Sequence, residues 1–226
     1  MKIKALLTGA TGMVGEGVLL ECLRNPNVEH VLVLGRKSSG VRHAKVTELL
    51  VPDLANLSAV ESQLMGYDAC FFCAGISSVG VSKAEYERIT HDMTLAVGET
   101  LARLNPDLTF IYVSGAGTDS TEKASSHWAR VKGRTENELL ALPFRRAYMF
   151  RPGFMRPQDG QKNVPKLMGV IDVLYPIVRR LAPKLACTLR EVARAMIAAA
   201  RDGAPKPVLE VLDIVALGHG KAPVRA

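Results

Sequence analysis

The chain has 226 residues, of which 48% are hydrophobic and 23% charged. This composition suits one α/β domain with a large buried core. Asp172 and Pro176 interrupt the longest apolar stretch, so no transmembrane segment is expected. The net charge of +7 is spread along the chain without a DNA- or RNA-binding motif, which argues against nucleic acid as a partner. Four cysteines and no convincing secretory signal predict a cytoplasmic protein.

Short apolar stretches of strand length alternate with stretches of helical periodicity along the whole chain. We expect strands over residues 3–7, 31–34, 46–51, 69–73, 109–113, 147–150 and 208–212. We expect helices over residues 13–23, 82–104, 129–140 and 190–201. This alternation predicts an α/β fold, a doubly wound parallel sheet with helices on both faces. Without a linker or repeat, residues 1–226 form one predicted domain, with 153–186 as a small helical cap on the substrate side.

A glycine-rich segment, Thr8-Gly9-Ala10-Thr11-Gly12-Met13-Val14-Gly15, joins the first predicted strand to the first predicted helix. In this context Gly9 permits a tight turn, Gly12 admits a pyrophosphate close to the backbone, and Gly15 lets helix and strand pack closely. The N–H groups at the start of the helix attract the anion. The predicted pyrophosphate turn comprises Gly9, Thr11, Gly12, Met13, Val14 and Gly15.

The T-G-x-T-G-x-x-G spacing resembles that of the extended and atypical branches of the short-chain dehydrogenase/reductase superfamily, which have a Rossmann fold. Residues 128–136 and 148–154 are similar to segments of NAD-dependent epimerases/dehydratases and Tat-interacting-protein-like oxidoreductases. The resemblance implies further cofactor contacts after later strands. It places Asp53 and Leu54 at the adenine, Ala74 and Gly75 along the cofactor, and Pro152 and Gly153 at the nicotinamide end.

Two basic residues, Arg36 and Lys37, follow the second predicted strand, where NAD-specific relatives have an acidic residue. A carboxylate there would bind a ribose hydroxyl, whereas a guanidinium would pair with a 2′-phosphate. The expected cofactor is therefore NADP, with NAD less favoured. No metal site is expected, because Cys70 and Cys73 would point to opposite faces of a strand.

The resemblance also implies a catalytic set of Ser, Tyr and Lys. Ser114 directly follows the fifth predicted strand and would polarise a substrate carbonyl, while Lys132 in the next helix would hold the nicotinamide ribose. The Tyr position is occupied by Trp128, whose indole N–H donates a hydrogen bond but cannot shuttle a proton. Losing a positioned general acid slows a reaction by roughly 10²–10⁴-fold.

Three interpretations of this departure stay open. The first is slow or altered redox or epimerase-like chemistry on an unidentified small molecule, using Ser114, Lys132 and a water or substrate group. The second is a non-catalytic NADP(H)-binding protein that controls a protein partner, with Trp128 closing the pocket. In the third, Trp128 is a packed aromatic and the acid lies elsewhere, the candidates being Ser77, Ser78 and His91; His127 would face away from Trp128. A homodimer is compatible with each.

Overall fold

The computed structural model describes residues 2–165 and 168–220. Within these residues, seven parallel strands form one sheet in the order β3-β2-β1-β4-β5-β6-β9. The strands are β1 (Ile3–Thr8), β2 (Val28–Gly35), β3 (Val46–Leu50), β4 (Ala69–Phe72), β5 (Thr109–Val113), β6 (Arg146–Arg151) and β9 (Val208–Glu210). Successive strands run outward from β1 in both directions, so the strand order reverses beside it. The predicted doubly wound sheet is confirmed.

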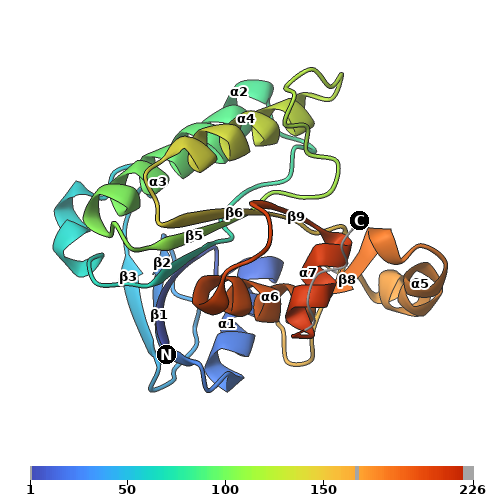
Figure 1. Ribbon diagram of the computed structural model, residues 1–226, viewed down its shortest axis with the longest axis horizontal. Helices are drawn as coiled ribbons and strands as arrows, with labels where there is room; N and C mark the ends of the chain where they lie inside the picture. Colours follow the sequence, from blue (N-terminus) through green and yellow to red (C-terminus); the bar gives the residue numbers. More distant parts are fainter. Residues whose placement is uncertain (1, 166–167, 221–226) are drawn as a thin grey trace.

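Helices cover both faces of the sheet (Figure 1). One face carries α1 (Met13–Arg24), α6 (Leu189–Asp202) and α7 (Val211–Gly218); the other carries α2 (Lys83–Glu87), α3 (Met93–Leu104) and α4 (His127–Ala141). Alternate residues of β1 enter the two cores, Leu7 on the α1 and α6 side and Leu6 on the α3 side. Burial on both faces explains why the central strands are almost continuously apolar.

The structure interrupts one predicted helix and shortens one predicted strand. The predicted helix over 82–104 contains a π-helical turn (Arg88–Asp92) between α2 and α3, which directs Arg88 and Thr90 toward the cleft described below. The predicted strand over 208–212 was too long, because β9 ends at Glu210 and α7 begins at Val211. Glu210 caps this helix reciprocally with Asp213, whose carboxylate accepts a bond of 2.9 Å from the Glu210 N–H.

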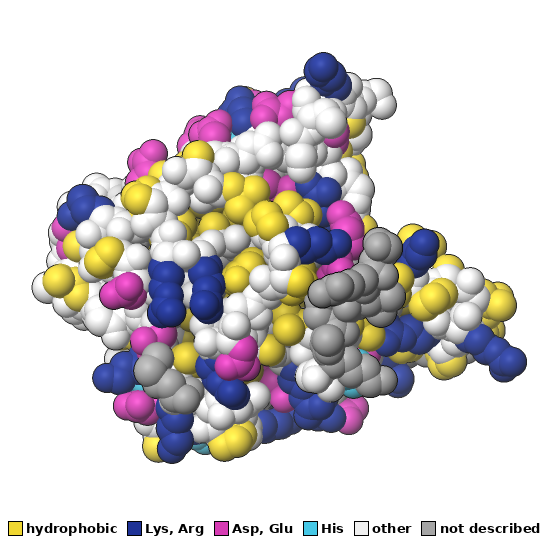
Figure 2. Space-filling model, viewed as in Figure 1, with side chains coloured by type: hydrophobic (Ala, Val, Ile, Leu, Met, Phe, Trp, Pro, Cys, Tyr) yellow, Lys and Arg dark blue, Asp and Glu magenta, His cyan; other side chains and the backbone are white. Residues whose placement is uncertain are grey.

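The segment proposed as a cap, residues 153–186, leaves the main sheet at β6. Its ends form a second, two-stranded parallel sheet from β7 (Phe154–Arg156) and β8 (Ala186–Thr188), which the sequence did not predict. Between them lie α5 (Met168–Leu181) and a 3₁₀ turn (Pro183–Leu185). Helix α5 projects from the main body, and basic and apolar side chains share the surface of this projection (Figures 1 and 2).

None of the helices in the described part of the chain is long and apolar enough to cross a membrane.

Candidate active site

The glycine turn lies at the carboxyl end of β1, where the strand order reverses. Gly9 has φ +72°, and a Cβ there would lie 2.5 Å from the Cys73 carbonyl oxygen. A Cβ on Gly15 would lie only 2.1 Å from the Gly9 carbonyl oxygen. The Gly12 N–H donates to that same oxygen at 2.9 Å. The turn therefore requires glycine at positions 9 and 15, and it brings helix α1 directly against the strand ends.

Thr8 fixes this turn to the neighbouring strand. Its hydroxyl accepts hydrogen bonds from the backbone N–H groups of Cys73, at 3.2 Å, and Ala74, at 3.1 Å. Thr8 is fully buried. Removing its hydroxyl would therefore take away a buried acceptor from both backbone N–H groups. Thr8 was not among the predicted site residues. A hydroxyl directly before the first glycine of the motif is the signal that could have suggested it.

An outer cavity of about 270 Å³ lies beside the turn. Its lining joins residues predicted to bind adenine, the 2′-phosphate and the middle of the cofactor: Arg36, Asp53, Leu54, Ala74 and Gly75. Arg36 is exposed and forms no ion pair with any described residue. Lys37 is also exposed but is not part of the lining.

Arg88 also lines this outer cavity and was not predicted. It comes from the π-helical turn and pairs with Glu85 at 2.9 Å. The cavity thus brings two guanidinium groups, from Arg36 and Arg88, to one place.

An inner cavity of about 240 Å³ shares Ala74, Gly75 and Ile76 with the outer one. The two together form a continuous cleft along the carboxyl ends of β1, β4, β5 and β6, where doubly wound sheets bind ligands. The inner lining includes the predicted residues Val14, Ser114, Lys132 and Pro152, and the unpredicted residues Cys73, Thr90, Tyr112 and Met155. Neither lining includes the other predicted residues of the glycine turn, nor Gly153. The turn residues in question are Gly9, Thr11, Gly12, Met13 and Gly15.

Lys132 is the titratable group in the inner cavity whose pKa comes closest to neutrality. Its ammonium donates a hydrogen bond to the backbone carbonyl of Ser114. Burial lowers the pKa of Lys132 to about 8, against the opposing attraction of Glu136. Burial also raises the pKa of the Tyr112 phenol, which stays protonated at neutral pH. A buried ammonium with this pKa can give up a proton near physiological pH.

The Ser114 hydroxyl is engaged inside the protein. It lies 2.5 Å from Oε1 of Glu136 and 3.1 Å from the Phe150 carbonyl oxygen, both of them acceptors. Glu136 is fully buried and accepts two bonds from the Arg151 guanidinium, at 2.5 and 3.0 Å. The single hydroxyl proton therefore points to Glu136 or Phe150. Toward the cavity, Ser114 can act only as a hydrogen-bond acceptor, through its oxygen lone pairs.

Glu136 was not predicted as part of the site; Arg151 belongs to the turn predicted at the nicotinamide end, but its ion pair with Glu136 was not predicted. Glu136 follows Lys132 by one turn of α4, and a carboxylate on the inward face of a helix was the available signal. Helix α4 approaches the loop after β5 closely at Gly133, where a Cβ would meet the Asp119 carbonyl oxygen at 1.8 Å. This contact brings Glu136 over the ends of β5 and β6.

Trp128 is not part of either cavity lining. Its ring covers Gly117, where a Cβ would lie 3.2 Å from the indole. The ring of His127 packs edge-on against Tyr86, with the centroids 6.3 Å apart. His91 is held by Asp92 at 2.8 Å and Glu138 at 3.0 Å.

Neither histidine lines the cleft, and Ser77 and Ser78 lie in an exposed loop outside both linings. The structure thus brings Lys132 and Ser114 together with the predicted cofactor residues and leaves the alternative acids elsewhere.

The sheet topology and the cleft at its strand ends define a Rossmann fold, as the glycine motif predicted. A sequence profile of the NAD dependent epimerase/dehydratase family matches residues 5–131. This match covers more than half of the chain, which therefore belongs to that family.

Two fungal proteins illustrate the more similar sequences. The protein fmp52, mitochondrial, of Emericella nidulans is 28% identical over 162 residues, which cover 67% of this chain and 66% of that protein. The leucinostatins biosynthesis cluster protein T of Purpureocillium lilacinum is 29% identical over 140 residues, 61% of this chain and 51% of that protein. The matched region thus spans less than two thirds of either relative.

Two solved structures share the fold. The Bordetella bronchiseptica enzyme WbmF, in complex with NAD⁺ and UDP, superposes with a TM-score of 0.66 at 16% identity, covering 100% of this chain and 80% of that one. A UDP-N-acetylglucosamine 4-epimerase from Methanobrevibacter ruminantium M1 has a TM-score of 0.67 at 18% identity, with coverages of 92% and 76%. At sequence identities of 16% and 18%, these two comparisons show a shared fold alone.

Proposed function

We propose that this protein binds NADP(H) in the cleft and catalyses hydride transfer between the cofactor and a small carbonyl compound, with Lys132 as the proton donor. The observation that carries the proposal is the position of Lys132. Its ammonium lines the inner cavity and has a pKa of about 8, whereas Trp128 lies outside the lining.

The cleft residues fit a nicotinamide dinucleotide. The glycine turn leaves no space for side chains at Gly9 and Gly15, so backbone N–H groups and the start of α1 can approach a pyrophosphate. Arg36, unpaired among the described residues, would hold the 2′-phosphate, and Asp53 and Leu54 would contact the adenine. When bound, the nicotinamide supplies or accepts the hydride.

The proton would come from the Lys132 ammonium. One of its three N–H groups is held by the Ser114 carbonyl, which leaves two for a substrate oxygen or the nicotinamide ribose. In carbonyl reduction, Lys132 would donate a proton to the developing alkoxide and recover one from solvent. The network of Ser114, Glu136 and Arg151 would position the end of β5, and with it the carbonyl that orients Lys132.

Cofactor preference can be measured by calorimetric titration with NADPH and NADH. We expect Arg36→Gln to weaken NADPH binding by about tenfold or more, because one charge-assisted bond to phosphate is lost, and to leave NADH binding unchanged. Lys37→Gln is the matched control and should change little, since Lys37 does not line the cavity. If neither cofactor binds, or if Arg36→Gln leaves the preference for NADPH intact, the cofactor proposal is wrong.

Proton donation can be tested with NADPH oxidation by a panel of simple aldehydes and ketones across pH. A reduction that needs the Lys132 ammonium should slow as the pH rises through about 8, where this group loses its proton. Lys132→Met should reduce the rate by roughly 10²-fold or more. NADPH affinity, measured on the same variant, separates lost chemistry from lost binding.

Trp128→Tyr is the companion variant in this assay. Because position 128 lies outside the cavity lining, the new phenol should leave the rate and its pH dependence unchanged. A large gain in activity would instead indicate that the native site has lost its general acid at position 128. That result would contradict the assignment of Lys132 as the proton donor.

A second candidate function is a non-catalytic NADP(H) sensor that controls a protein partner. The engagement of the Ser114 hydroxyl by Glu136 favours it, because the site then offers no serine O–H donor to a substrate carbonyl. Tight NADPH binding without turnover of any compound in the panel, together with a change in oligomeric state or partner capture on binding, would support the sensor over the enzyme.

A further inference from the structure

A second pocket, of about 530 Å³, lies between α1 and α6 and extends to α7. The turn of residues 25–27, which leads into the amino end of β2, forms one of its walls. The cofactor turn instead follows the carboxyl end of β1. Because β1 and β2 are parallel, the pocket lies at the amino ends of the strands and the cleft at their carboxyl ends. The pocket is therefore separate from the cleft, and its volume falls in the range of small-molecule sites.

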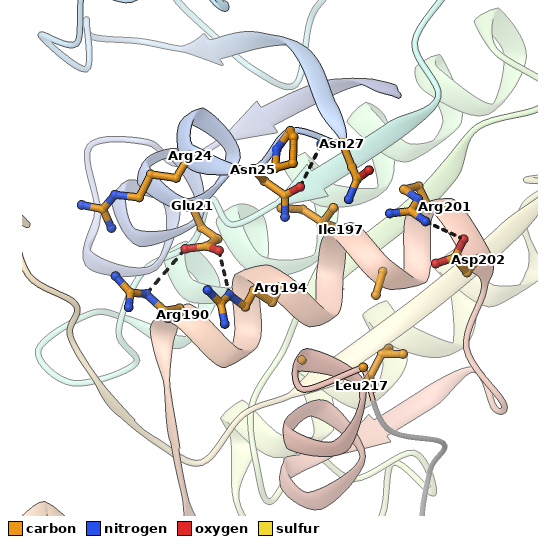
Figure 3. A pocket seen from close by; sticks show the side chains of 14 residues that line it. Glu21, Arg24, Asn25, Asn27, Arg190, Arg194, Ile197, Arg201, Asp202 and Leu217 are labelled. Atoms are coloured by element: carbon orange, nitrogen blue, oxygen red, sulfur yellow. Dashed lines mark hydrogen bonds and ion pairs between the residues drawn. The ribbon is translucent and has the colours of Figure 1, made fainter. Parts of the chain in front are cut away.

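Positive charge dominates the lining of this pocket. Four guanidinium groups contribute to it, from Arg24, Arg190, Arg194 and Arg201, against two carboxylates, from Glu21 and Asp202. Three of the arginines come from α6, which presents one side to the pocket (Figure 3). The lining thus carries an excess of two positive charges. Arginine keeps its charge at any physiological pH, so the excess is permanent.

Glu21 organises two of these arginines. Its side chain is 5% exposed and lies 2.8 Å from Arg194 and 3.6 Å from Arg190, so one buried carboxylate holds two guanidinium groups (Figure 3). Both arginine side chains remain nearly half exposed, at 45% and 48%. They are therefore fixed by Glu21 and still accessible to a ligand, which lowers the entropy that binding would cost.

The other two arginines keep most of their charge available. Arg24 donates to neutral acceptors, Oε1 of Gln158 at 3.2 Å and the Asp159 carbonyl at 3.4 Å. Among the described residues, Arg201 pairs with the neighbouring carboxylate of Asp202, at 3.4 Å, and that carboxylate is 63% exposed. Exposed pairs of this kind are weak, so each guanidinium group can still bind an anion. Arg24 lies beside Arg190 and Arg194 at one end of the pocket, and Arg201 lies at the other end (Figure 3).

Besides Asn25, Asn27 and two glycines, the remainder of the lining is apolar. Ile197 and Ala198 come from α6, Leu217 from α7 and Pro26 from the turn after α1. Such a lining, a cluster of guanidinium groups beside a small apolar surface, matches a molecule that has a doubly charged head and an apolar body. We propose that this pocket binds a small organic phosphate monoester as its dianion, independently of the dinucleotide in the cleft.

The test is calorimetric titration of the full chain with phenyl phosphate, inorganic phosphate and phenyl sulfate, with and without NADPH. We expect phenyl phosphate to bind with a Kd on the order of 1 mM or below. Inorganic phosphate should bind several-fold more weakly because it lacks the apolar body, and phenyl sulfate because it carries one charge. NADPH should leave these affinities unchanged. Competition by NADPH would place the phosphate in the cleft and overturn the proposal.

Variants are best made at the arginines that do not hold Glu21. Arg24→Gln should weaken phenyl phosphate by about tenfold, because Arg24 lies beside the two arginines that Glu21 holds. Arg201→Gln, at the far end of the pocket, should weaken it less. Ala198→Glu, which adds a carboxylate to the pocket, should abolish measurable binding.

The matched control is Arg103→Gln on α3. Arg103 lies on the opposite face of the sheet, is 59% exposed and pairs with Glu61 at 2.5 Å. This variant should bind phenyl phosphate like the parent protein. Absence of binding to the parent, or equal loss in Arg103→Gln and Arg24→Gln, would overturn the proposal. Thermal denaturation of each variant shows whether a loss of binding reflects a loss of folding.

Discussion

The two ends of the cleft are built in different ways. At the β1–α1 turn, the groups that face a bound cofactor would be backbone atoms of residues 9–15, held in place by the Thr8 hydroxyl and the Cys73 backbone. At the end of β5 the corresponding groups are side chains. They come from the residue after β5, from α4 and from β6: Ser114, Lys132, Glu136 and Arg151. The first site depends on space for the backbone, and the second on a buried network of charges.

This difference determines how each end responds to change. A backbone turn fails when a side chain is added, because the added atoms collide with carbonyl groups. A buried charge network fails when a side chain is removed, because the remaining charges lose their partners. Three pairs of variants can separate these two behaviours.

The largest effect should come from Glu136→Ala. This change leaves the Arg151 guanidinium and the Ser114 hydroxyl without their buried acceptor, and breaking a buried pair in this way costs about 3–5 kcal/mol of the free energy of unfolding. Glu210→Ala is the control, because Glu210 also pairs with Arg151 but is 50% exposed. It should cost only about 1–2 kcal/mol, most of it from the lost N-cap of α7. Urea unfolding measures both, and similar costs would show that the buried network does not stabilise the end of the cleft.

An intermediate effect should come from Gly9→Ala. Gly9 and Gly40 have the same φ of +72°, but only Gly9 is crowded, while a Cβ on Gly40 has open space around it. The left-handed conformation costs roughly 1–2 kcal/mol in either case, and the collision with Cys73 adds about 1–3 kcal/mol at position 9 alone. Gly9→Ala should also abolish NADPH binding, which Gly40→Ala should preserve. Equal unfolding free energies for the two variants would contradict the crowding seen at the turn.

The smallest effect should come from Thr8→Val. The hydroxyl of Thr8 accepts from two backbone N–H groups, whereas that of Thr94, equally buried, has no hydrogen-bond partner among the described residues. Thr8→Val should cost about 1–3 kcal/mol, and Thr94→Val should cost nothing or stabilise the protein slightly. If thermal unfolding shows both variants to be equal, the contact between β1 and the segment after β4 does not depend on this hydroxyl.

Much of the fold was predictable because its signals are local. The seven strands of the main sheet and the main helices follow from periodicity, and the glycine turn follows from a contiguous motif. The predictions failed where a local signal was short. The two-stranded sheet of β7 and β8 rests on three-residue strands, and the end of β9 depends on the cap that Glu210 and Asp213 form.

The alternation of strands and helices, the glycine turn and the family could be predicted from the sequence, because each has a signal in local periodicity or in a contiguous motif. Which side chains share the cleft could not be predicted in this way and became visible in the three-dimensional packing. This packing placed Trp128 over Gly117 and outside the cavity, turned the Ser114 hydroxyl toward Glu136, and gathered four arginines around the pocket beside α6. The physical reason is that packing between distant segments sets the direction and burial of a side chain, and with them its pKa and its partners.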